Sequence, residues 1–313
     1  MADDILKNIP LPADLPENWT SDQTVAPTGA EVGMDEQHGY NYLMQQVNNA
    51  QKAATALNAG KLSLSGGTMT GPLILEDGYN AYGIASNAAA HNVAPPRFKN
   101  LGTAPTPEML AAIKAGTFDD LFVGDYWIIN GIKFFIADFN YWLFSGDKTC
   151  TTNHAVILPG KIFYSSVMNA DASTSSGYIG SYMYKTGLKS AENSIAEAFG
   201  SEHLLTHRER FSNAAVNGRI EGTAWVDNTV TLMSESMVYG GRQISIGGND
   251  YSVDFSQLSI FRSNMIRSIG HENFWLRDIT GPRSFAFVTD TKTANSASAN
   301  SNMGVLPVFG LIG

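Results

Sequence analysis

The chain has 313 residues, enough for two domains of about 150 residues each. Charged residues make up only 16% and aromatic residues 11% of the sequence, while glycine and small polar residues are frequent. This composition is typical of β-rich proteins. The formal net charge is −9 and the sequence contains no basic run, which argues against nonspecific binding to nucleic acid or to an anionic membrane surface.

Cys150 is the single cysteine, which excludes a disulfide within the chain and a zinc site built from several thiolates. We expect a buried thiol there rather than a catalytic one. The first residues lack the basic patch and apolar core of a signal peptide, and no run approaches the roughly 20 apolar residues of a membrane span. We therefore expect synthesis in a cytoplasm without membrane insertion, and action outside the cell only after release within an assembled particle.

Residues 1–34 contain four prolines among polar residues, which predicts an extended arm. Beyond them, apolar side chains follow the alternating three-and-four spacing that keeps one stripe of a helix against a partner helix. The positions of this seam are Tyr40, Leu43, Val47, Ala50, Ala54 and Leu57. The pattern predicts a short coiled coil. The alternative is a single amphipathic helix that packs on the chain's own core.

Residues 63–75 combine two turn signals, Gly66-Gly67 and Gly71-Pro72, with a sparse apolar face. An isolated hairpin of this kind is marginal in water, so the segment favours several copies of the chain around one axis. The predicted organisation is an arm over residues 1–34, a trimerisation stalk over 35–75, a connector over 76–107 and a globular head over 108–313.

The first half of the head begins with a short helix over residues 108–116, with Pro107 near its start and Gly116 at its end. Residues 122–137 predict two strands joined by a tight turn at Asn130-Gly131, which is a strong hairpin signal. A further strand is expected over residues 154–158.

The second half of the head begins with two expected helices, over residues 190–199 and 202–211. Residues 223–237 predict strand or mixed structure. Three late strands are expected over residues 274–277, 284–288 and 305–312, with residues 295–302 as a loop before the last. Strands at both ends of the domain with helices between them indicate an α+β head.

Two polar stretches are candidates for ligand contact. Tyr178, Tyr182 and Tyr184 lie in a stretch rich in tyrosine, serine and glycine, which suits adaptable contacts and stacking on sugar rings. The alternative is that these tyrosines pack within the domain or against a neighbouring subunit. The second stretch contains Asn295, Asn300 and Asn302, as an exposed loop tip or as a spacer without contacts.

Catalytic and metal-binding signals are weak. His203 and His207 are four residues apart on an expected helix, a spacing that could chelate a metal, but no third ligand is evident. Asp125 and Asp138 could form a carboxylate pair for sugar hydrolysis, yet each lies at a strand end, where aspartate commonly accepts backbone hydrogen bonds. We therefore predict no catalytic residue, metal site or cofactor.

Three charged residues of the head, Arg208, Arg277 and Asp278, are expected to form hydrogen bonds within the domain rather than contacts with a ligand.

Several short motifs resemble those of phage tail proteins. Residues 17–20, 23–33 and 37–44 resemble the N-terminal segment of tail-fibre and receptor-binding proteins from phages of Gram-positive, Clostridia-like hosts. The segment Gly66-Gly-Thr-Met-Thr-Gly-Pro72 is similar to a repeat of many long tail fibres.

The head resembles an uncharacterised domain of Gram-positive surface proteins and phage tail proteins. The matching segments are residues 124–131, 136–138, 168–169, 177–183, 204–208, 274–277 and 304–308. That domain usually ends in Gly-Val-Arg-Pro, and Leu306 stands where the arginine is expected. The closing strands also resemble the end of C-type-lectin-like domains, which implies such a fold for the head. Residues 225–228 are only faintly similar to the calcium motif of sugar-binding C-type lectins.

The resemblance implies a homotrimeric receptor-binding protein of a virion tail, without enzymatic activity. Its arm would attach to phage tail or baseplate proteins, and its head would bind the bacterial envelope, with surface carbohydrate favoured over surface protein. Many weak heads on one particle would gain avidity. Two alternatives stay open, a cell-wall-polysaccharide depolymerase on the same stalk and a structural baseplate component.

Overall fold

The computed structural model describes residues 47–53, 88–93, 96–245, 256–262, 269 and 272–313. Contacts divide the chain into two units, Met1–Gly71 and Pro72–Gly313. In the first unit, the described residues 47–53 are helical, and Val47 of the predicted seam is 48% exposed in the single chain. The arm over 1–34, the seam residues Tyr40, Leu43, Ala54 and Leu57, and the hairpin over 63–75 lie outside the described residues. The trimeric stalk therefore stays a prediction.

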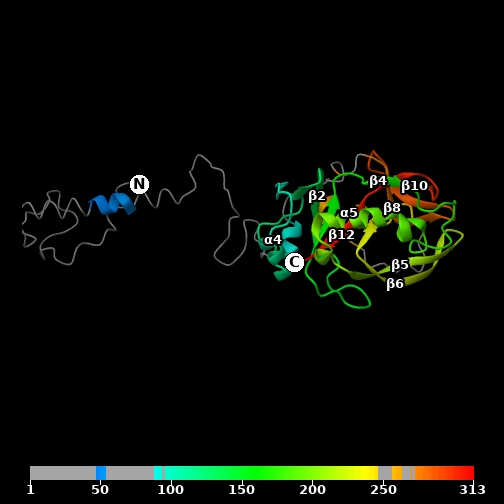
Figure 1. Ribbon diagram of the computed structural model, residues 1–313, viewed down its shortest axis with the longest axis horizontal. Helices are drawn as coiled ribbons and strands as arrows, with labels where there is room; N and C mark the ends of the chain where they lie inside the picture. Colours follow the sequence, from blue (N-terminus) through cyan, green and yellow to red (C-terminus); the bar gives the residue numbers. More distant parts are fainter. Residues whose placement is uncertain (1–46, 54–87, 94–95, 246–255, 263–268, 270–271) are drawn as a thin grey trace, which may run out of the picture. The chain divides into compact units, whose positions relative to one another are not determined.

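The described residues of the second unit form two five-stranded sheets, a separate two-stranded ribbon and several helices, which confirms a mixed α+β head (Figure 1). The first sheet contains, in spatial order, β1 (Tyr126–Ile129), β2 (Ile132–Phe139), β3 (Ala155–Pro159), β12 (Pro307–Leu311) and β7 (Val230–Leu232). All of its neighbouring strands are antiparallel.

The second sheet contains, in spatial order, β10 (Ala294–Ser298), β9 (Ser284–Val288), β8 (Phe274–Gly281), β11 (Met303–Val305) and β4 (Tyr164–Ser166). Its pairs are antiparallel except for β11 and β8, which pair in parallel at Gly304 and Phe274. One residue, the fully buried Leu306, separates β11 from β12. The chain therefore passes from the interior of one sheet directly into the interior of the other.

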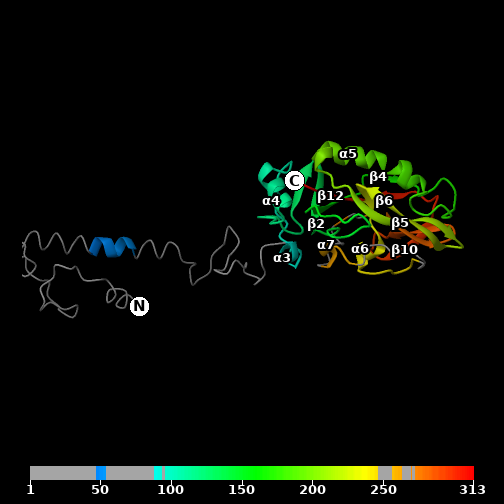
Figure 2. The same cartoon turned by 90° about the horizontal axis from the view of Figure 1, so that it is seen from below.

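The helices are short, and none among the described residues is long and apolar enough to cross a bilayer. They are α3 (Ala88–Val93), α4 (Pro107–Ala115), α5 (Lys189–Phe199), α6 (Glu235–Tyr239) and α7 (Ser259–Arg262), with single turns η1 (Met183–Gly187) and η2 (Ser201–His203) flanking α5. Figure 2 shows α5 on one side of the first sheet and α6 and α7 on the other. Phe199 of α5 packs edge-on against Phe134 and Phe309, at ring distances of 5.1 and 5.2 Å, and so fixes this helix to the core.

Several predicted elements of the head are confirmed. Helix α4 begins where Thr106 accepts a hydrogen bond from the Met109 amide and ends at Gly116, which has a left-handed φ of 74°. Strands β1 and β2 meet at Asn130 and Gly131, with φ of 50° and 73°, as a type I′ turn requires. Helix α5 and strand β3 also lie close to their predicted ranges.

The predicted helix over residues 202–211 is wrong. The chain turns once in η2 and then enters β5 (His207–Val216), which pairs with β6 (Arg219–Asn228) to form the two-stranded ribbon. Burial along β5 alternates, with His207, Glu209 and Phe211 facing inward, and this two-residue period belongs to a strand. Two of these three inward side chains are polar, which hid the strand pattern.

The predicted loop over residues 295–302 is wrong for its first half. Residues 294–298 form β10, which pairs with β9 at the edge of the second sheet, so only residues 299–302 form a turn. An edge strand exposes much of its side-chain surface, so small polar residues are tolerated there. The predicted strand over 305–312 is two strands, β11 and β12.

The described part of the predicted connector packs on the head. His91 and Leu101 are buried, and Asn100 forms a β-bridge with Tyr126 of β1. Residues 88–93 and 96–107 therefore belong structurally with the globular unit.

Candidate ligand-binding groove

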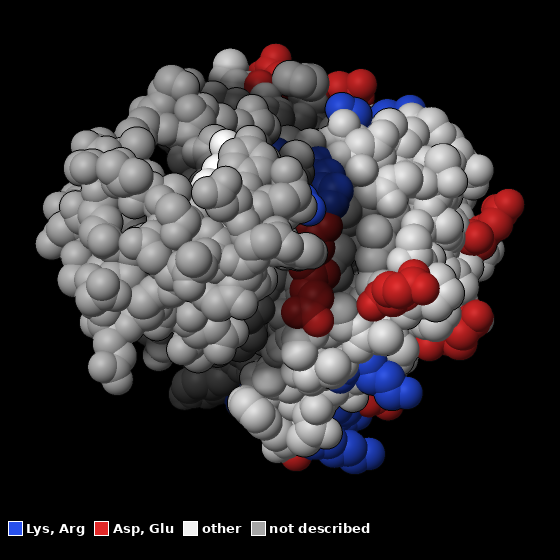
Figure 3. Space-filling view, turned by 90° about the vertical axis from the view of Figure 1, so that its left-hand side faces the viewer, with Lys and Arg blue, Asp and Glu red and all other residues white. Residues whose placement is uncertain are grey.

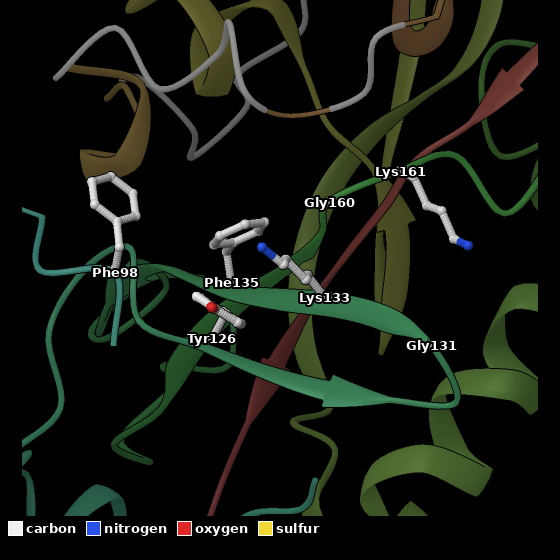
Figure 4. A pocket seen from close by; sticks show the side chains of 7 residues that line it. All are labelled: Phe98, Tyr126, Gly131, Lys133, Phe135, Gly160 and Lys161. Carbon is white, nitrogen blue, oxygen red and sulfur yellow. The ribbon is translucent and has the colours of Figure 1, made fainter. Parts of the chain in front are cut away.

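An open groove of about 560 Å³ runs along the β1–β2 hairpin (Figure 4). Its lining residues are Phe98, Tyr126, Gly131, Lys133, Phe135, Gly160 and Lys161. Phe98 and the half-buried Tyr126 supply exposed aromatic surface, the Phe135 ring beside them is only 7% exposed, and two lysines supply charge. We call this site the hairpin groove.

The rings of the hairpin groove are placed by strand register and by the segment that precedes β1. Tyr126 and Phe135 are directly opposite each other on β1 and β2, with ring centroids 5.4 Å apart. Phe98 approaches from outside the sheet, and its ring lies against Gly124, where an added Cβ would be 3.0 Å from the Phe98 ring. The absence of a side chain at Gly124 therefore lets Phe98 pack beside the hairpin.

Phe98 has an unusual backbone for a bulky residue, with φ of 58°, and it is 42% exposed. Its neighbours Arg97 and Lys99 both bind acidic side chains of the head. Arg97 contacts Asp125 and Asp120, and the Lys99 amide donates to Asp125 at 2.9 Å. These contacts on both sides hold the exposed ring in place despite the backbone strain.

Gly160 leaves room for the Phe135 ring at the hairpin groove. Its amide donates to the Lys133 carbonyl at 2.7 Å, which brings the residue after β3 close to β2. A Cβ at position 160 would lie 2.7 Å from Cε2 of Phe135, too close for the ring to stay where it is. Phe135 thus occupies space that only glycine leaves free.

The two lysines of the hairpin groove are exposed. The Lys133 ammonium lies 4.5 Å from the centroid of the Tyr126 ring, a cation–π contact. Among the described residues, no carboxylate forms an ion pair with Lys133 or Lys161, whereas Arg97 and Lys99 are neutralised by Asp120 and Asp125. The face in Figure 3 shows acidic and basic side chains interspersed.

A second, polar pocket of about 390 Å³ lies beside β4 and β11. It is lined by Ser165, Glu272, Asn273, Asp290, Asn302, Met303 and Gly304. Asn273 connects two parts of the pocket lining. Its side chain accepts a hydrogen bond from the Asp290 amide at 2.8 Å, and its backbone carbonyl accepts one from the Gly304 amide at 2.9 Å. No group of three or more potential ligands among the described residues is placed to hold a metal ion.

The three predicted tyrosines have different environments. Tyr178 is 1% exposed, so it is a core residue and not a surface contact. Its hydroxyl lies 3.0 Å from that of Thr231 and accepts a hydrogen bond from the Leu232 amide at 3.1 Å, and burial raises its pKa. Tyr184 is partly buried against Tyr178, at 5.2 Å. Tyr182 is 45% exposed and is the member of the set that faces solvent.

The predicted asparagines lie in β10 and in the turn that follows it. Asn295 is exposed on β10, and Asn300 is exposed in the following turn, where its side chain accepts a hydrogen bond from Ser298 at 2.7 Å. None of the three tyrosines or three asparagines lines the hairpin groove, and only Asn302 lines the polar pocket.

The two carboxylates considered for hydrolysis have structural partners, as expected. Asp125 is fully buried and accepts hydrogen bonds from the amides of Lys99 and Phe122, at 2.9 and 3.0 Å. Asp138 accepts hydrogen bonds from the amide and hydroxyl of Ser259, both at 2.8 Å, and burial raises its pKa.

A buried charged cluster joins the ribbon to β8, and sequence reasoning missed its central residue, Glu209. The Glu209 carboxylate lies 2.8 Å from His207 Nε2 and 2.8 Å from Arg277 Nη2. Burial alone would raise the Glu209 pKa, but the charge of Arg277 and the contact with His207 outweigh it and lower the pKa to about 2. The three side chains are nearly inaccessible, so the cluster is structural.

His203 and His207, which were expected on one helix and whose spacing could chelate a metal, instead lie at the end of η2 and the start of β5, and His207 is part of this cluster. Of the charged residues expected to bond internally, Arg208 donates to Asp147 at 2.7 Å and Asp278 accepts from the Glu235 amide at 2.7 Å. Cys150 is buried, as expected.

No protein-family model, curated protein or solved structure matches the chain.

Proposed function

We propose that the chain is a homotrimeric receptor-binding protein of a phage tail or tail-like particle, which binds carbohydrate on the bacterial envelope. The observation that carries this proposal is the open aromatic groove on the β1–β2 hairpin. Aromatic faces stack on the apolar faces of sugar rings, while charged and polar groups beside them bind hydroxyl or acidic substituents.

The assembly part of the proposal rests on the sequence motifs. The arm over residues 1–34 would attach to the particle, residues 35–75 would form the trimeric stalk, and the head would have a C-type-lectin-like fold. The helix at residues 47–53 agrees with a helical stalk. Light scattering should give three times the 33.7 kDa of one chain, and the mass of a single chain would contradict the trimer.

Binding to cells tests the function. The full chain, fluorescently labelled, should bind cells of some strains in a panel of Gram-positive, Clostridia-like bacteria, with saturation and with competition by unlabelled protein. Tyr126→Ala should strongly reduce binding, because it removes one ring of the hairpin groove. Tyr182→Ala is the matched control, since it removes an exposed tyrosine elsewhere and should leave binding unchanged. Loss of binding in the control alone would place the site at Tyr182 instead.

A second candidate function is depolymerisation of cell-wall polysaccharide. The observation in its favour is the polar pocket, which places the carboxylates of Glu272 and Asp290 on one open surface. This function predicts that reducing ends are released from purified host envelope, and that Glu272→Gln and Asp290→Asn each abolish the release. Binding without any release over a long incubation would exclude it. A purely structural baseplate role predicts no binding to cells at all.

A further inference from the structure

We propose that the hairpin groove is specific for an acidic polysaccharide, a polymer with a phosphate or carboxylate group in each repeat, and that Lys133 and Lys161 determine this specificity. The inference rests on the proposed function and names its ligand class. It begins from an electrostatic contrast. The chain carries a net charge of −9, yet two exposed lysines without acidic partners among the described residues line this one groove.

Lys133 combines a charge with an aromatic surface. Its ammonium lies over the ring of Tyr126, and Phe135 is packed beside the same ring. The ammonium is exposed, so it keeps hydrogen-bond donors for a bound anion. An acidic group at the ammonium would place the adjoining sugar ring next to the aromatic faces. One unit of an acidic polysaccharide offers both features.

Lys161 adds a second cation at another point of the groove. Figure 4 shows the Lys133 ammonium beside the aromatic rings and the Lys161 ammonium beyond Gly160, pointing away from them. Two separated cations in an open groove suit a chain with repeated charges better than a single compact anion, which would need convergent donors.

The other features of the groove agree with a flexible polymer. The groove is open and shallow rather than enclosed, so an extended chain can enter and leave without opening the fold. A nucleic acid is a poor fit, because its dense charge requires many basic side chains and would be repelled by the net charge of the protein.

Direct binding measurements with the full chain test the inference. The probes are a glycerol-phosphate polymer, polygalacturonate and neutral dextran of similar length. We expect binding to at least one acidic polymer, with affinity that falls as salt is raised, and no comparable binding to dextran. The two acidic probes distinguish phosphate from carboxylate recognition.

A pair of double variants isolates the two lysines. Lys133→Gln/Lys161→Gln should weaken binding of the acidic polymer about tenfold, the range expected for two exposed ion pairs. Lys114→Gln/Lys185→Gln removes two exposed lysines from α4 and η1, changes the net charge equally and should leave binding unchanged. All four substitutions are at exposed positions, so folding should be retained.

The inference is overturned if neither acidic polymer binds, if dextran binds equally well, or if the two double variants behave alike. These failures are distinguishable from failure of the proposed function. Binding to host cells without any preference for acidic polymers would support the proposed function and contradict the acidic-polysaccharide specificity. The absence of binding to any host cell would contradict the proposed function itself.

Discussion

The Arg97 guanidinium forms a bidentate ion pair with the buried carboxylate of Asp125, with Nη2 2.6 Å from Oδ2 and Nε 3.3 Å from Oδ1. Asp125 is fully buried while the Arg97 side chain is 32% exposed, so the arginine covers the carboxylate from the solvent side. The same carboxylate accepts the Lys99 amide. A single aspartate thus fastens the segment that carries Phe98 to the start of β1.

We predict that Asp125→Asn lowers the free energy of unfolding by about 3 kcal/mol, because removing one partner of a buried ion pair leaves unsatisfied groups behind. Urea denaturation followed by tryptophan fluorescence measures the loss. Asp147→Asn is the control, since Asp147 pairs with Arg208 at the exposed surface and its loss should have a much smaller effect. Equal losses in the two variants would contradict a special role for Asp125.

His154 is buried as a neutral imidazole. The Trp142 amide donates to its Nε2 at 3.1 Å, so Nδ1 carries the proton and donates to the Thr152 carbonyl at 2.9 Å. Burial is the main reason that the His154 pKa is lowered from 6.5 to about 4. The hydrogen bond to the Thr152 carbonyl opposes this shift, and the charge of the nearby His207 adds to it. Protonation would disrupt the bond from Trp142.

The lowered pKa makes stability depend on pH. Between pH 6.5 and 4 the unfolded state binds the proton more readily than the folded state, so the contribution of His154 is fully present above pH 6.5 and is lost as the pH falls towards 4. The expected loss is about 3 kcal/mol. Urea titrations across this range should show the slope, and His154→Gln, which can accept and donate the same bonds, should reduce it. An unchanged slope in the variant would refute the assignment.

The buried cluster of Glu209 and Arg277 should behave as a unit. Arg277→Met leaves the Glu209 carboxylate buried without its main counter-charge, and we expect a loss of about 3–5 kcal/mol. The double variant Glu209→Met/Arg277→Met removes both charges, so it should cost less than the sum of the two single changes. Thermal denaturation of all four proteins measures this coupling, and additive losses would show that the pair is not coupled.

Acid should also weaken this cluster. The Glu209 pKa is lowered to about 2 from 4.5, so its contribution is present above pH 4.5 and is lost as the pH falls towards 2. This range overlaps that of His154 only between pH 4 and 4.5, so the loss between pH 6.5 and 4.5 reports His154 and the loss below pH 4 reports Glu209.

Two Asn-Gly turns differ in the space around their glycines, and the same substitution in each tests that difference. Gly131 and Gly218 end equivalent turns, with φ of 73° and 79°. A Cβ at Gly131 meets nothing within 4 Å, whereas a Cβ at Gly218 would lie 2.6 Å from the backbone of Gly281. Gly131→Ala should cost about 1–2 kcal/mol from the left-handed backbone alone. Gly218→Ala should lower the melting temperature clearly further, and equal shifts would contradict the close approach.

Local signals predicted those parts of the fold that neighbouring residues determine. The Asn130-Gly131 turn and the cap residues Thr106 and Gly116 act within a few positions, so their elements were identified correctly. Strand β5 was missed because its inward face is partly polar, and contacts with the distant Arg277 and with His207 make a buried Glu209 acceptable there. The Asn217-Gly218 pair was an available signal of that hairpin.

The hairpin groove was not foreseen for a similar reason. Its rings come from Phe98, Tyr126 and Phe135, and its charges from Lys133 and Lys161, which the sequence distributes over three separate segments. Nothing in the local pattern around Phe98 indicates that Arg97 and Lys99 are bound to Asp125 and Asp120. The tyrosine-rich stretch was more visible in the sequence, but the packing of Tyr178 in the core depends on the distant Thr231.

The short passage from β11 through Leu306 to β12 has a consequence for how the head opens. Both strands are interior, β11 between β8 and β4 and β12 between β3 and β7. If either strand leaves its sheet, the edges of two neighbouring strands are left unpaired. Because one residue links β11 to β12, movement of one strand out of its sheet also pulls on the other. The amide hydrogens of β11 and β12 should therefore exchange with solvent only through global unfolding, which makes them the slowest reporters of the lifetime of the folded head.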